Sequence, residues 1–338
     1  MTITFGIFGA GMATKPHLEA FQKLSPEIKL KGITSRSVEK SIRLSKESSI
    51  FHYPDAKSMA KDPELDAVLI ATPPNARLDY VELFAKAGKH ILLEKPIERT
   101  TQAAIEIVSI CEKSNIFLRI VLQHRYRTAS LQLKLLLDPG NLGAVHAVNI
   151  QVPWWREQSY YDPPGRGTYE RDGGGVLITQ AIHTLDLLLY LLGPIDQVKA
   201  TGGTSKFHKM EAEDFVNAGL IFQSGAFGSL FATTSAFPGS SEKIEIYAEL
   251  ATAKLGGGSL SVHWKSGKTD HWKEEGGSGS GSDPMAFSCE PHRELISEFS
   301  KSVRDGHQPG INGRNFLSVH RLIEQLASSI RLPGLSLI

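Results

Sequence analysis

The stretch Gly6-Ile7-Phe8-Gly9-Ala10-Gly11-Met12-Ala13-Thr14 lies where the first apolar strand of the chain gives way to the first helix. A glycine-rich turn in this context can hold a pyrophosphate, because backbone amides and the amino end of the helix point at it. Thr14 stands where the usual fingerprint has a third glycine. We predict that Gly9, Gly11, Met12 and Ala13 contact a dinucleotide; the alternative is a glycine turn of another α/β domain.

The first 122 residues alternate short apolar strands with amphipathic helices, which is typical of a parallel sheet with crossover helices. The segments are ITFGIF, LEAFQKL, KLKGIT, KSIRLSKE, LDAVLIAT, YVELFAKAG, KHILLE, AAIEIVSICEKS and FLRIVL. Gly88 should end its helix in the left-handed conformation. We therefore predict a doubly wound Rossmann domain over residues 1–122, in the α/β class.

From about Ala144 the pattern changes to longer alternating stretches, which indicate one large, mostly antiparallel open sheet. They are AVHAVNIQV, DQVKATGG, DFVNAGLIFQ, AFGSLFATTSA, EKIEIYAEL and SLSVHW. Helices are expected at about 175–192, 292–305 and 314–329. Residues 123–338 are thus predicted to form an α+β domain for substrate binding and oligomerisation. The segment GGSGSGS at 276–282 is either a natural loop or an artificial linker, and composition does not decide between them.

Composition limits the classes of partner and compartment. Lys plus Arg number 37 against 36 for Asp plus Glu, so no net field attracts nucleic acid or an anionic membrane. The apolar stretch 176–192 contains Gln180, His183 and Asp186 and is too polar to cross a bilayer. The amino terminus lacks the features of a signal peptide. Cys111 and Cys289 have no metal-binding or redox spacing, so we expect free thiols, no metal and a cytoplasmic protein.

The tip of the second strand bears on the choice of coenzyme. An NAD-specific fold places a carboxylate about 20 residues after the glycines to bind the ribose hydroxyls. Here the tip reads Thr34-Ser35-Arg36-Ser37, with a hydroxyl and a guanidinium that suit a 2′-phosphate. We predict that Ser35 and Arg36 favour NADP over NAD. The alternative is that Ser35 caps the next helix and Arg36 lies on its surface.

Several stretches together resemble a known family. They are GIFGAGMA near the amino terminus, Ala71-Thr72-Pro73-Pro74-Asn75, Glu94-Lys95-Pro96, GGGVLITQAIHTLDLLLYLLG at 173–193, and EPHRELISEF at 290–299. Over nearly the whole chain they resemble the glucose-fructose oxidoreductase, inositol dehydrogenase and rhizopine-catabolism (Gfo/Idh/MocA) family. The resemblance implies a Rossmann domain, a cofactor between the domains, and an open sheet that often mediates a homodimer or homotetramer.

The resemblance assigns a role to Lys95, which matches the family lysine that contacts the nicotinamide and the substrate hydroxyl. Partial burial beside an oxidised nicotinamide would lower the pKa of this amine and let it share or relay a proton. The alternative is an exposed lysine that ends a strand. The same motifs place Thr72, Pro73, Asn75 and Glu94 among the predicted cofactor contacts. Gln123, after the sixth strand, is predicted to contact nicotinamide or substrate.

His183 is the predicted general base. Helical spacing puts Thr179, His183, Asp186 and Tyr190 on one stripe, and an imidazole with a pKa near ~6.5 can exchange the hydroxyl proton. The alternative is a core histidine. Many family members have a carboxylate where this chain has Thr179, so Asp186 or a substrate hydroxyl would orient the imidazole. This departure favours keto-sugar reduction or a modified sugar over inositol or glucose.

A loop between the first strand of the large sheet and the histidine helix is rich in aromatic and charged residues. Rings and hydrogen-bond forks of this kind suit the apolar faces and hydroxyls of a sugar. We predict that Trp155, Arg156 and Tyr161 bind the substrate, together with Thr179 and Asp186. The alternative is that these aromatics pack a subunit contact or cover the sheet edge.

The sequence therefore predicts an NAD(P)-dependent oxidoreductase that moves a hydride between nicotinamide and a carbinol or ketone carbon of a sugar or sugar-like polyol. The alternatives are a catalytically silent sensor of NADP or a metabolite, and an unrelated small-ligand-binding α/β protein. The pair of proton-handling groups, Lys95 and His183, favours the enzyme.

Overall fold

The computed structural model describes residues 2–273, 288–307 and 312–330, so the 276–282 segment lies outside the described residues. The chain forms two compact units. The first comprises Met1–Gln123 and Cys289–Leu317, and the second comprises His124–Ser288 and Ser318–Ile338. None of the described helices is both long and apolar enough to span a membrane.

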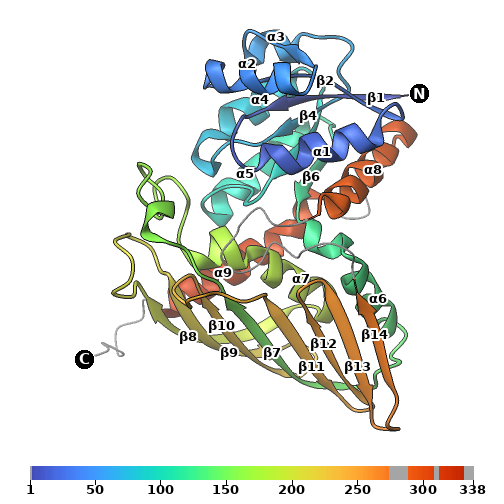
Figure 1. Ribbon diagram of the computed structural model, residues 1–338, viewed down its shortest axis with the longest axis vertical. Helices are drawn as coiled ribbons and strands as arrows, with labels where there is room; N and C mark the ends of the chain where they lie inside the picture. The colour runs from blue at the N-terminus through green and yellow to red at the C-terminus, as the bar shows by residue number, and fades with distance from the viewer. Residues whose placement is uncertain (1, 274–287, 308–311, 331–338) are drawn as a thin grey trace. The chain divides into compact units, whose positions relative to one another are not determined.

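The first unit is a doubly wound α/β fold, as predicted (Figure 1). Its six strands are all parallel, in the order β3-β2-β1-β4-β5-β6. The strands are β1 (Ile3–Phe8), β2 (Ile28–Thr34), β3 (Phe51–His52), β4 (Ala67–Ile70), β5 (His90–Glu94) and β6 (Leu118–Val121). The connecting helices are α1 (Thr14–Leu24), α2 (Val38–Glu47), α3 (Ala56–Ala60), α4 (Leu78–Lys86) and α5 (Thr101–Lys113).

Local sequence explains most of this unit. The central strands β1, β4 and β5 are almost entirely buried, which is why they read as largely apolar runs. Gly88 follows α4 with φ +69°, the left-handed conformation predicted for it. The two-residue edge strand β3 and the short helix α3 were missed, because neither is long enough to show a period.

The chain returns to the first unit near its carboxyl end. Helix α8 (Glu290–Asp305) packs on α1, and Phe299 contacts Phe5 with ring centroids 6.2 Å apart. Lys23 on α1 pairs with Glu290 at 2.6 Å. The predicted division at residue 122/123 assigned this segment to the second domain; the structure places residues 289–317 in the first unit, because the apolar side of α8 covers it.

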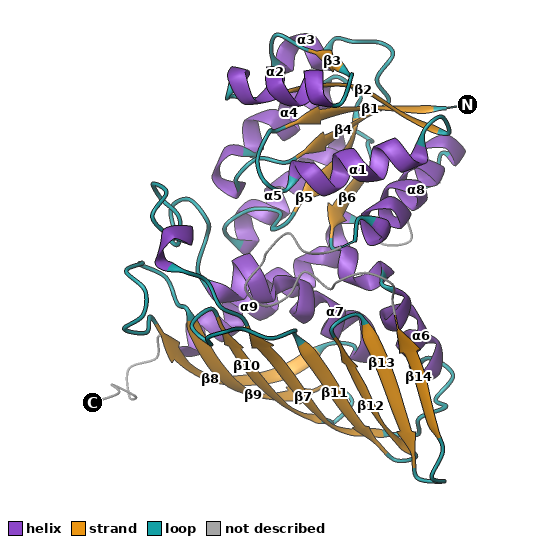
Figure 2. Ribbon diagram, viewed as in Figure 1, coloured by secondary structure: helices purple, strands orange, loops and turns teal. Residues whose placement is uncertain are grey.

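The second unit is built on one eight-stranded sheet in the order β14-β13-β12-β11-β7-β10-β9-β8 (Figure 2). Every neighbouring pair is antiparallel except β7 and β10, so the predicted mostly antiparallel sheet is confirmed. The strands are β7 (Val145–Pro153), β8 (Ile195–Gly203), β9 (Phe215–Phe222), β10 (Phe227–Thr233), β11 (Lys243–Ala248), β12 (Ala251–Gly256), β13 (Ser259–Trp264) and β14 (Thr269–Lys273).

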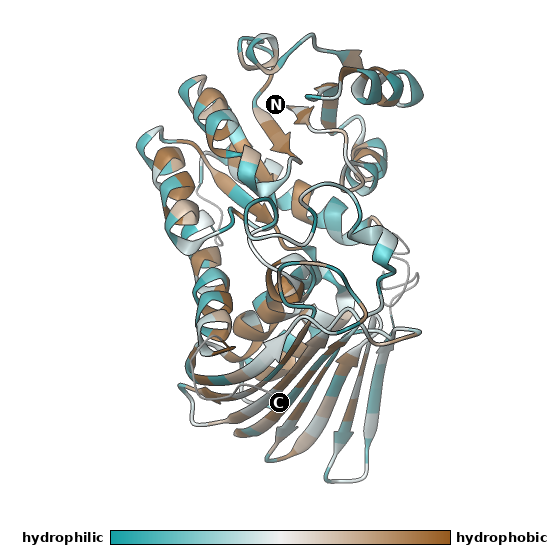
Figure 3. Ribbon diagram, turned by 90° about the vertical axis from the view of Figure 1, so that its left-hand side faces the viewer, coloured by the Kyte–Doolittle hydropathy of each residue, from teal (hydrophilic) through white to brown (hydrophobic). Residues whose placement is uncertain are grey.

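Helices α6 (Thr128–Leu137), α7 (Ile182–Leu192) and α9 (Leu317–Ile330) cover one face of this sheet. The strands alternate between hydrophobic and hydrophilic residues (Figure 3), and the covered face is the origin of this alternation. Ile150, Leu230 and Ile244 are buried, whereas their strand neighbours are partly or fully exposed. Helix α6 and strands β12 and β14 were missed. In α6 the apolar residues run together, and Leu131 and Leu135 remain exposed, so no clear helical period appears.

Candidate functional site

The glycine turn after β1 has the tight geometry expected for it. Gly9 has φ +136°, and its amide donates to the carbonyl oxygen of Thr34 at 2.9 Å. A Cβ at position 9 would lie 2.5 Å from the carbonyl oxygen of Ala71, so glycine is required. At Gly11 a Cβ would meet no atom of the described residues within 4 Å. The backbone at Gly11 is therefore open to a ligand.

The start of α1 completes this turn. The Thr14 hydroxyl donates to the Gly9 carbonyl oxygen at 3.2 Å and so closes the turn at the position of the missing third glycine. Ala13 is the N-cap residue and supplies no side-chain cap, and Met12 is 56% exposed. The amides of Thr14 and Lys15 donate to the carbonyl oxygens of Gly11 and Met12 at 3.1 and 3.4 Å, and Pro16 has no N–H, so an anion at this end would be held by the turn that precedes the helix.

At the tip of β2, Ser35 does not cap the next helix. Its hydroxyl donates to the carbonyl oxygen of Ser37 at 2.8 Å, and Ser37 itself is the N-cap residue of α2. Arg36 is exposed and makes no ion pair with another described residue. Both side chains lie at the strand end where the sequence placed them.

The end of β4 carries three more of the predicted cofactor residues. The Thr72 hydroxyl is buried without a hydrogen-bond partner among the described residues, and so is the Oε1 atom of Gln123 after β6. Pro73 precedes a 3-10 turn, Pro74–Ala76, in which Asn75 is exposed.

A buried guanidinium that sequence reasoning missed ties the ends of β4 and β5 together. Arg77 donates to the carbonyl oxygen of Thr72 at 2.8 and 3.1 Å and to the carbonyl oxygen of Glu94. It also reaches the carbonyl oxygen of Lys95 at 3.3 Å and that of Ile97 at 3.4 Å. Burial lowers the pKa of Arg77 to about 10, against the opposing effect of nearby carboxylates, so it stays cationic at neutral pH. The main chain that carries Lys95 is therefore held rigidly.

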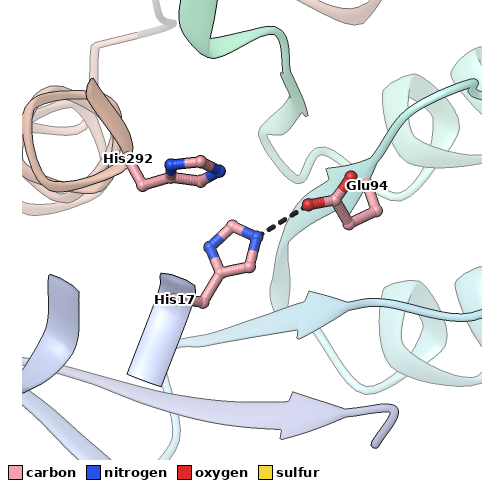
Figure 4. Close-up of side chains that lie close together, drawn as sticks. All are labelled: His17, Glu94 and His292. Atoms are coloured by element: carbon pink, nitrogen blue, oxygen red, sulfur yellow. Dashed lines mark hydrogen bonds and ion pairs between the residues drawn. The ribbon is translucent and has the colours of Figure 1, made fainter. Parts of the chain in front are cut away.

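Glu94 faces a buried pair of histidines rather than open space (Figure 4). Its Oε1 atom lies 2.7 Å from Nε2 of His17 on α1, and its Oε2 atom accepts the amide of Lys95 at 3.1 Å. His292 on α8 points to the same place, with its ring edge-on to His17 at 4.9 Å. The donor atoms of the three side chains lie within 4.8 Å of one another. The His17 to Glu94 separation is that of a hydrogen bond.

Electrostatics keep the Glu94 carboxyl ionised. Burial raises its pKa, but the hydrogen bond from His17 and the charges of His17, His292 and Lys95 outweigh burial, so the pKa lies below its ordinary value. Both carboxylate oxygens thus bond within the first unit, where the sequence had predicted a cofactor contact. The sequence signal for this contact was the histidine on the buried side of α1, which the sequence prediction did not include.

In the second unit, His183 lies at the start of α7 and is buried. The preceding turn, Leu177–Ala181, is a π-helix, a feature frequent at functional sites. The ring of His183 stacks on that of His124, with centroids 4.7 Å apart and planes at 23°. Nε2 of His124 lies 2.8 Å from the Arg127 guanidinium, which can only donate, so this nitrogen carries no proton.

The predicted polar stripe is reorganised. Asp186 accepts a bidentate pair from Arg125 at 2.5 and 2.6 Å, and the same guanidinium lies 4.8 Å from the ring centroid of Tyr190. Thr179 falls in the π-turn, where its hydroxyl donates to the Gly175 carbonyl oxygen at 2.6 Å and also contacts the side chain of the next residue. The π-turn breaks the α-helical spacing that predicted a continuous stripe.

A small cavity of about 20 Å³, room for roughly one water, adjoins His124. His124, Arg127, Thr184 and Glu242 are among its lining residues. The hydroxyl of Thr184 and the Oε2 atom of Glu242 are buried there without a hydrogen-bond partner among the described residues.

The predicted substrate loop is braced from within. Arg156 is buried, donates to the Trp155 carbonyl oxygen at 2.7 Å, and lies over the ring of Trp154. Tyr161 is also buried; burial raises the pKa of its phenol, and its hydroxyl shares a 2.7 Å hydrogen bond with Thr234. These two residues therefore hold the loop.

Trp155 is a half-buried member of the predicted substrate set. Its ring is edge-on to Phe207 and Phe237, which are 67% and 76% exposed. Of the predicted substrate residues, Trp155 thus contributes to an exposed aromatic surface, whereas Arg156 and Tyr161 lie beneath it in the loop.

Comparison with known proteins agrees with both units. A family model described as oxidoreductase family, NAD-binding Rossmann fold, matches residues 3–121, and a GFO/IDH/MocA C-terminal domain model matches residues 130–254. The myo-inositol 2-dehydrogenase of Thermotoga maritima is 25% identical, over 78% of this chain and 77% of its own length. The levoglucosan dehydrogenase of Pseudarthrobacter phenanthrenivorans is 24% identical, over 69% and 68%.

A solved relative extends the agreement along the whole chain. The WlbA dehydrogenase from Bordetella pertussis, determined in complex with NADH and UDP-GlcNAcA, has a TM-score of 0.83 and 28% identity. The alignment covers 98% of this chain and 97% of that chain. From its two matched units and its glycine turn, the chain belongs to the GFO/IDH/MocA family of oxidoreductases with an NAD-binding Rossmann fold.

Proposed function

We propose that this protein is an NAD(P)-dependent dehydrogenase or reductase that moves a hydride to or from a carbinol or ketone carbon of a sugar or sugar-like polyol. The observation that carries the proposal is the bracing of Lys95. A fully buried guanidinium and a buried carboxylate both bond to the main chain around this one amine. Buried charged groups that fix the main chain in this way suit a side chain whose position matters for chemistry.

The residues of the first unit fit a dinucleotide. Gly11 leaves the backbone open, and the glycine turn before α1 presents its main chain to a pyrophosphate. Thr72 has a buried hydroxyl with no partner among the described residues, which a bound group could satisfy. We assign Gly9, Gly11, Met12, Ala13, Thr72, Pro73, Asn75 and Gln123 to this site, with Lys95 at its reactive end.

When bound, the nicotinamide supplies the hydride acceptor or donor. Loss of the carbinol hydroxyl proton needs a base, and the His183 imidazole takes this proton in oxidation and gives it back in reduction. Lys95 donates a hydrogen bond to the same oxygen as negative charge develops on it. Asp186 acts through Arg125, which fixes the turn that carries His124 against the His183 ring.

For the coenzyme we propose NADP over NAD, with Ser35 and Arg36 at the 2′-phosphate. The support is an exposed guanidinium with no ion pair among the described residues and no carboxylate at the β2 tip. The test is the ratio of kcat/KM values for the two coenzymes. Arg36→Ala should lower the NADP to NAD ratio about 10-fold or more, whereas Arg43→Ala, on the exposed surface of α2, should leave it unchanged. An unaltered ratio in Arg36→Ala contradicts the assignment.

For the substrate we propose a sugar that carries an additional planar or charged group. The relatives named for myo-inositol and levoglucosan act on polyols and sugars, and the Bordetella relative was determined with a nucleotide-linked sugar. Trp155 with Phe207 and Phe237 offers rings on which such a group could stack. We propose that Arg156, Tyr161, Thr179 and Asp186, which bond within the second unit, support this substrate site.

The function is tested with a panel of sugars, keto-sugars, inositols and nucleotide-linked sugars, followed by nicotinamide absorbance with each coenzyme. On any active substrate, Lys95→Ala and His183→Ala should each lower kcat at least ~100-fold with little change in nucleotide affinity. Matched controls are Lys86→Ala on the exposed side of α4 and the exposed His146→Ala on β7. Tight nucleotide binding without turnover on the whole panel would favour a sensor, and full activity in both variants would refute the roles.

We further propose that the first unit binds the dinucleotide and that the second binds substrate and forms a homodimer or homotetramer through its sheet. The exposed Phe215 and Phe227 on the sheet support an interface there. Light scattering of Phe227→Lys should report a smaller particle than the parent protein. Both cysteines are free and buried, which suits a reducing compartment such as the cytoplasm.

A further inference from the structure

The carboxylate next to Lys95 belongs to a buried hydrogen-bonded chain that the proposed reaction does not itself use. Glu94 accepts from His17 through one oxygen and from the amide of Lys95 through the other. An ionised carboxylate can only accept, so Nε2 of His17 carries a proton. The remaining ring nitrogen, Nδ1 of His17, is buried without a hydrogen-bond partner among the described residues. The ring is thus held by its bond to Glu94.

Charged and titratable groups surround this carboxylate from every element packed against it. His17 lies on α1, His292 on α8, and Arg77 at the start of α4, while Lys95 and Glu98 follow β5. Burial raises the pKa of Glu94, but the hydrogen bond from His17 and the charges of His17, His292 and Lys95 outweigh burial and keep the carboxyl ionised. The site therefore holds one buried negative charge, with an oxygen 3.1 Å from the main-chain nitrogen of Lys95.

The interaction between Glu94 and Lys95 is reciprocal. The charge of Lys95 contributes to the lowered pKa of Glu94. By linkage, the ionised carboxylate stabilises the protonated amine by the same free energy. This opposes the loss of a proton from Lys95 that the sequence had suggested for a relay.

We propose that the His17–Glu94 pair keeps Lys95 in its ammonium form and fixes the main chain that carries it, which makes His17 and Glu94 positioning residues. The inference rests on the proposed function for its catalytic consequence. The proposal gives the two residues separate roles in the reaction. Lys95 remains a hydrogen-bond donor to the substrate oxygen, and His183 alone exchanges the proton.

The first test needs no substrate. The reactivity of the Lys95 amine toward acetic anhydride is measured against pH by mass spectrometry, with the exposed Lys86 of the same unit as internal reference. In Glu94→Gln, which keeps the shape and removes the charge, the midpoint for Lys95 should fall by about one pH unit, a roughly 10-fold gain in reactivity at lower pH. Glu106→Gln, an exposed carboxylate on α5, is the matched control and should not move the midpoint.

The His17 variants separate charge from shape. His17→Leu removes the donor and should shift the Lys95 midpoint in the same direction, whereas His17→Gln supplies an N–H and should restore most of the parent behaviour. If Glu94→Gln does not fold, the comparison of these two variants decides the matter. Unchanged Lys95 midpoints in Glu94→Gln, or in both His17 variants when Glu94→Gln does not fold, overturn the proposal.

The second test uses the reaction. The alkaline limb of kcat/KM against pH should move to lower pH in Glu94→Gln and His17→Leu, and kcat should fall more than nucleotide affinity. A shifted labelling midpoint in a protein that turns over no substrate would support the charge pair and refute the proposed function. An unshifted labelling midpoint in an enzyme that turns over substrate would support the proposed function and refute the charge pair.

Discussion

Replacement of Arg77 by Met tests whether the buried guanidinium fixes the ends of β4 and β5. Its bonds to the carbonyl oxygens of Thr72 and Glu94 are the best formed, and hydrogen bonds to charged groups contribute about 1.5–3 kcal/mol each. The long contacts to Lys95 and Ile97 add little. Part of the loss is offset, because burial disfavours the charged form of Arg77 and lowers its pKa to about 10. We expect a net loss of about 3 kcal/mol.

The assay must report on the first unit alone. All four tryptophans lie in the second unit, so their fluorescence follows that unit only. Hydrogen exchange of peptides that contain β4 and β5 should become about 100-fold faster in Arg77→Met. Arg77→Lys should restore part of the protection, because an ammonium still reaches one or two of the carbonyls.

The controls for this experiment are internal and external. The tryptophan unfolding transition should stay in place, and Arg43→Met, at an exposed position on α2, should leave exchange unchanged. If exchange of the β5 peptides in Arg77→Met stays within about 5-fold of the parent, the loss is near 1 kcal/mol or less. Water molecules would then satisfy these carbonyl oxygens, and the main chain at Lys95 would not depend on Arg77 for its rigidity.

Three further predictions follow from single features. Gly9→Ala should abolish dinucleotide binding and destabilise the first unit, because the Cβ would lie 2.5 Å from a carbonyl oxygen, whereas Gly11→Ala should weaken binding in a nucleotide titration without lowering the melting temperature. Burial raises the pKa of Asp62, but hydrogen bonds from Lys31 and Tyr53 outweigh burial and lower the pKa to about 2. The stabilisation from ionised Asp62 is therefore full above about pH 4 and is lost as the pH falls through 2. In Asp62→Asn, the free energy of unfolding measured against pH should lack this acid-sensitive component. Asp186→Asn, which leaves the Arg125 guanidinium buried without its carboxylate, should lower the stability of the second unit by about 3–5 kcal/mol, seen as an earlier tryptophan transition.

Local patterns predicted the parts of the protein that depend on neighbours in sequence. The glycine turn, the alternating strands of the large sheet and the end of α4 at Gly88 follow from backbone requirements of a few consecutive residues. The position of Lys95 at the end of β5 was predictable for the same reason. The family resemblance then gave these pieces their order.

Contacts between distant residues could not be predicted in this way. Glu94 was placed at the cofactor because it precedes Lys95, but His17 and His292, far away along the chain, determine where its carboxylate points. The pairing of Asp186 with Arg125 and the π-turn before α7 depend equally on packing. The identity of one residue does not indicate which distant residue it will contact, because many folds could bring a suitable partner to it.

The return of α8 to the first unit has a consequence for biosynthesis. Residues 289–317 belong to this unit, so a ribosome must translate the intervening residues 124–288 before the glycine-turn domain can close. Until then the nascent chain keeps the side of α1 that meets α8 bare, and His17 lacks His292 as its neighbour. A premature stop before codon 289 would thus leave the first unit, which begins synthesis first, without the segment that covers α1.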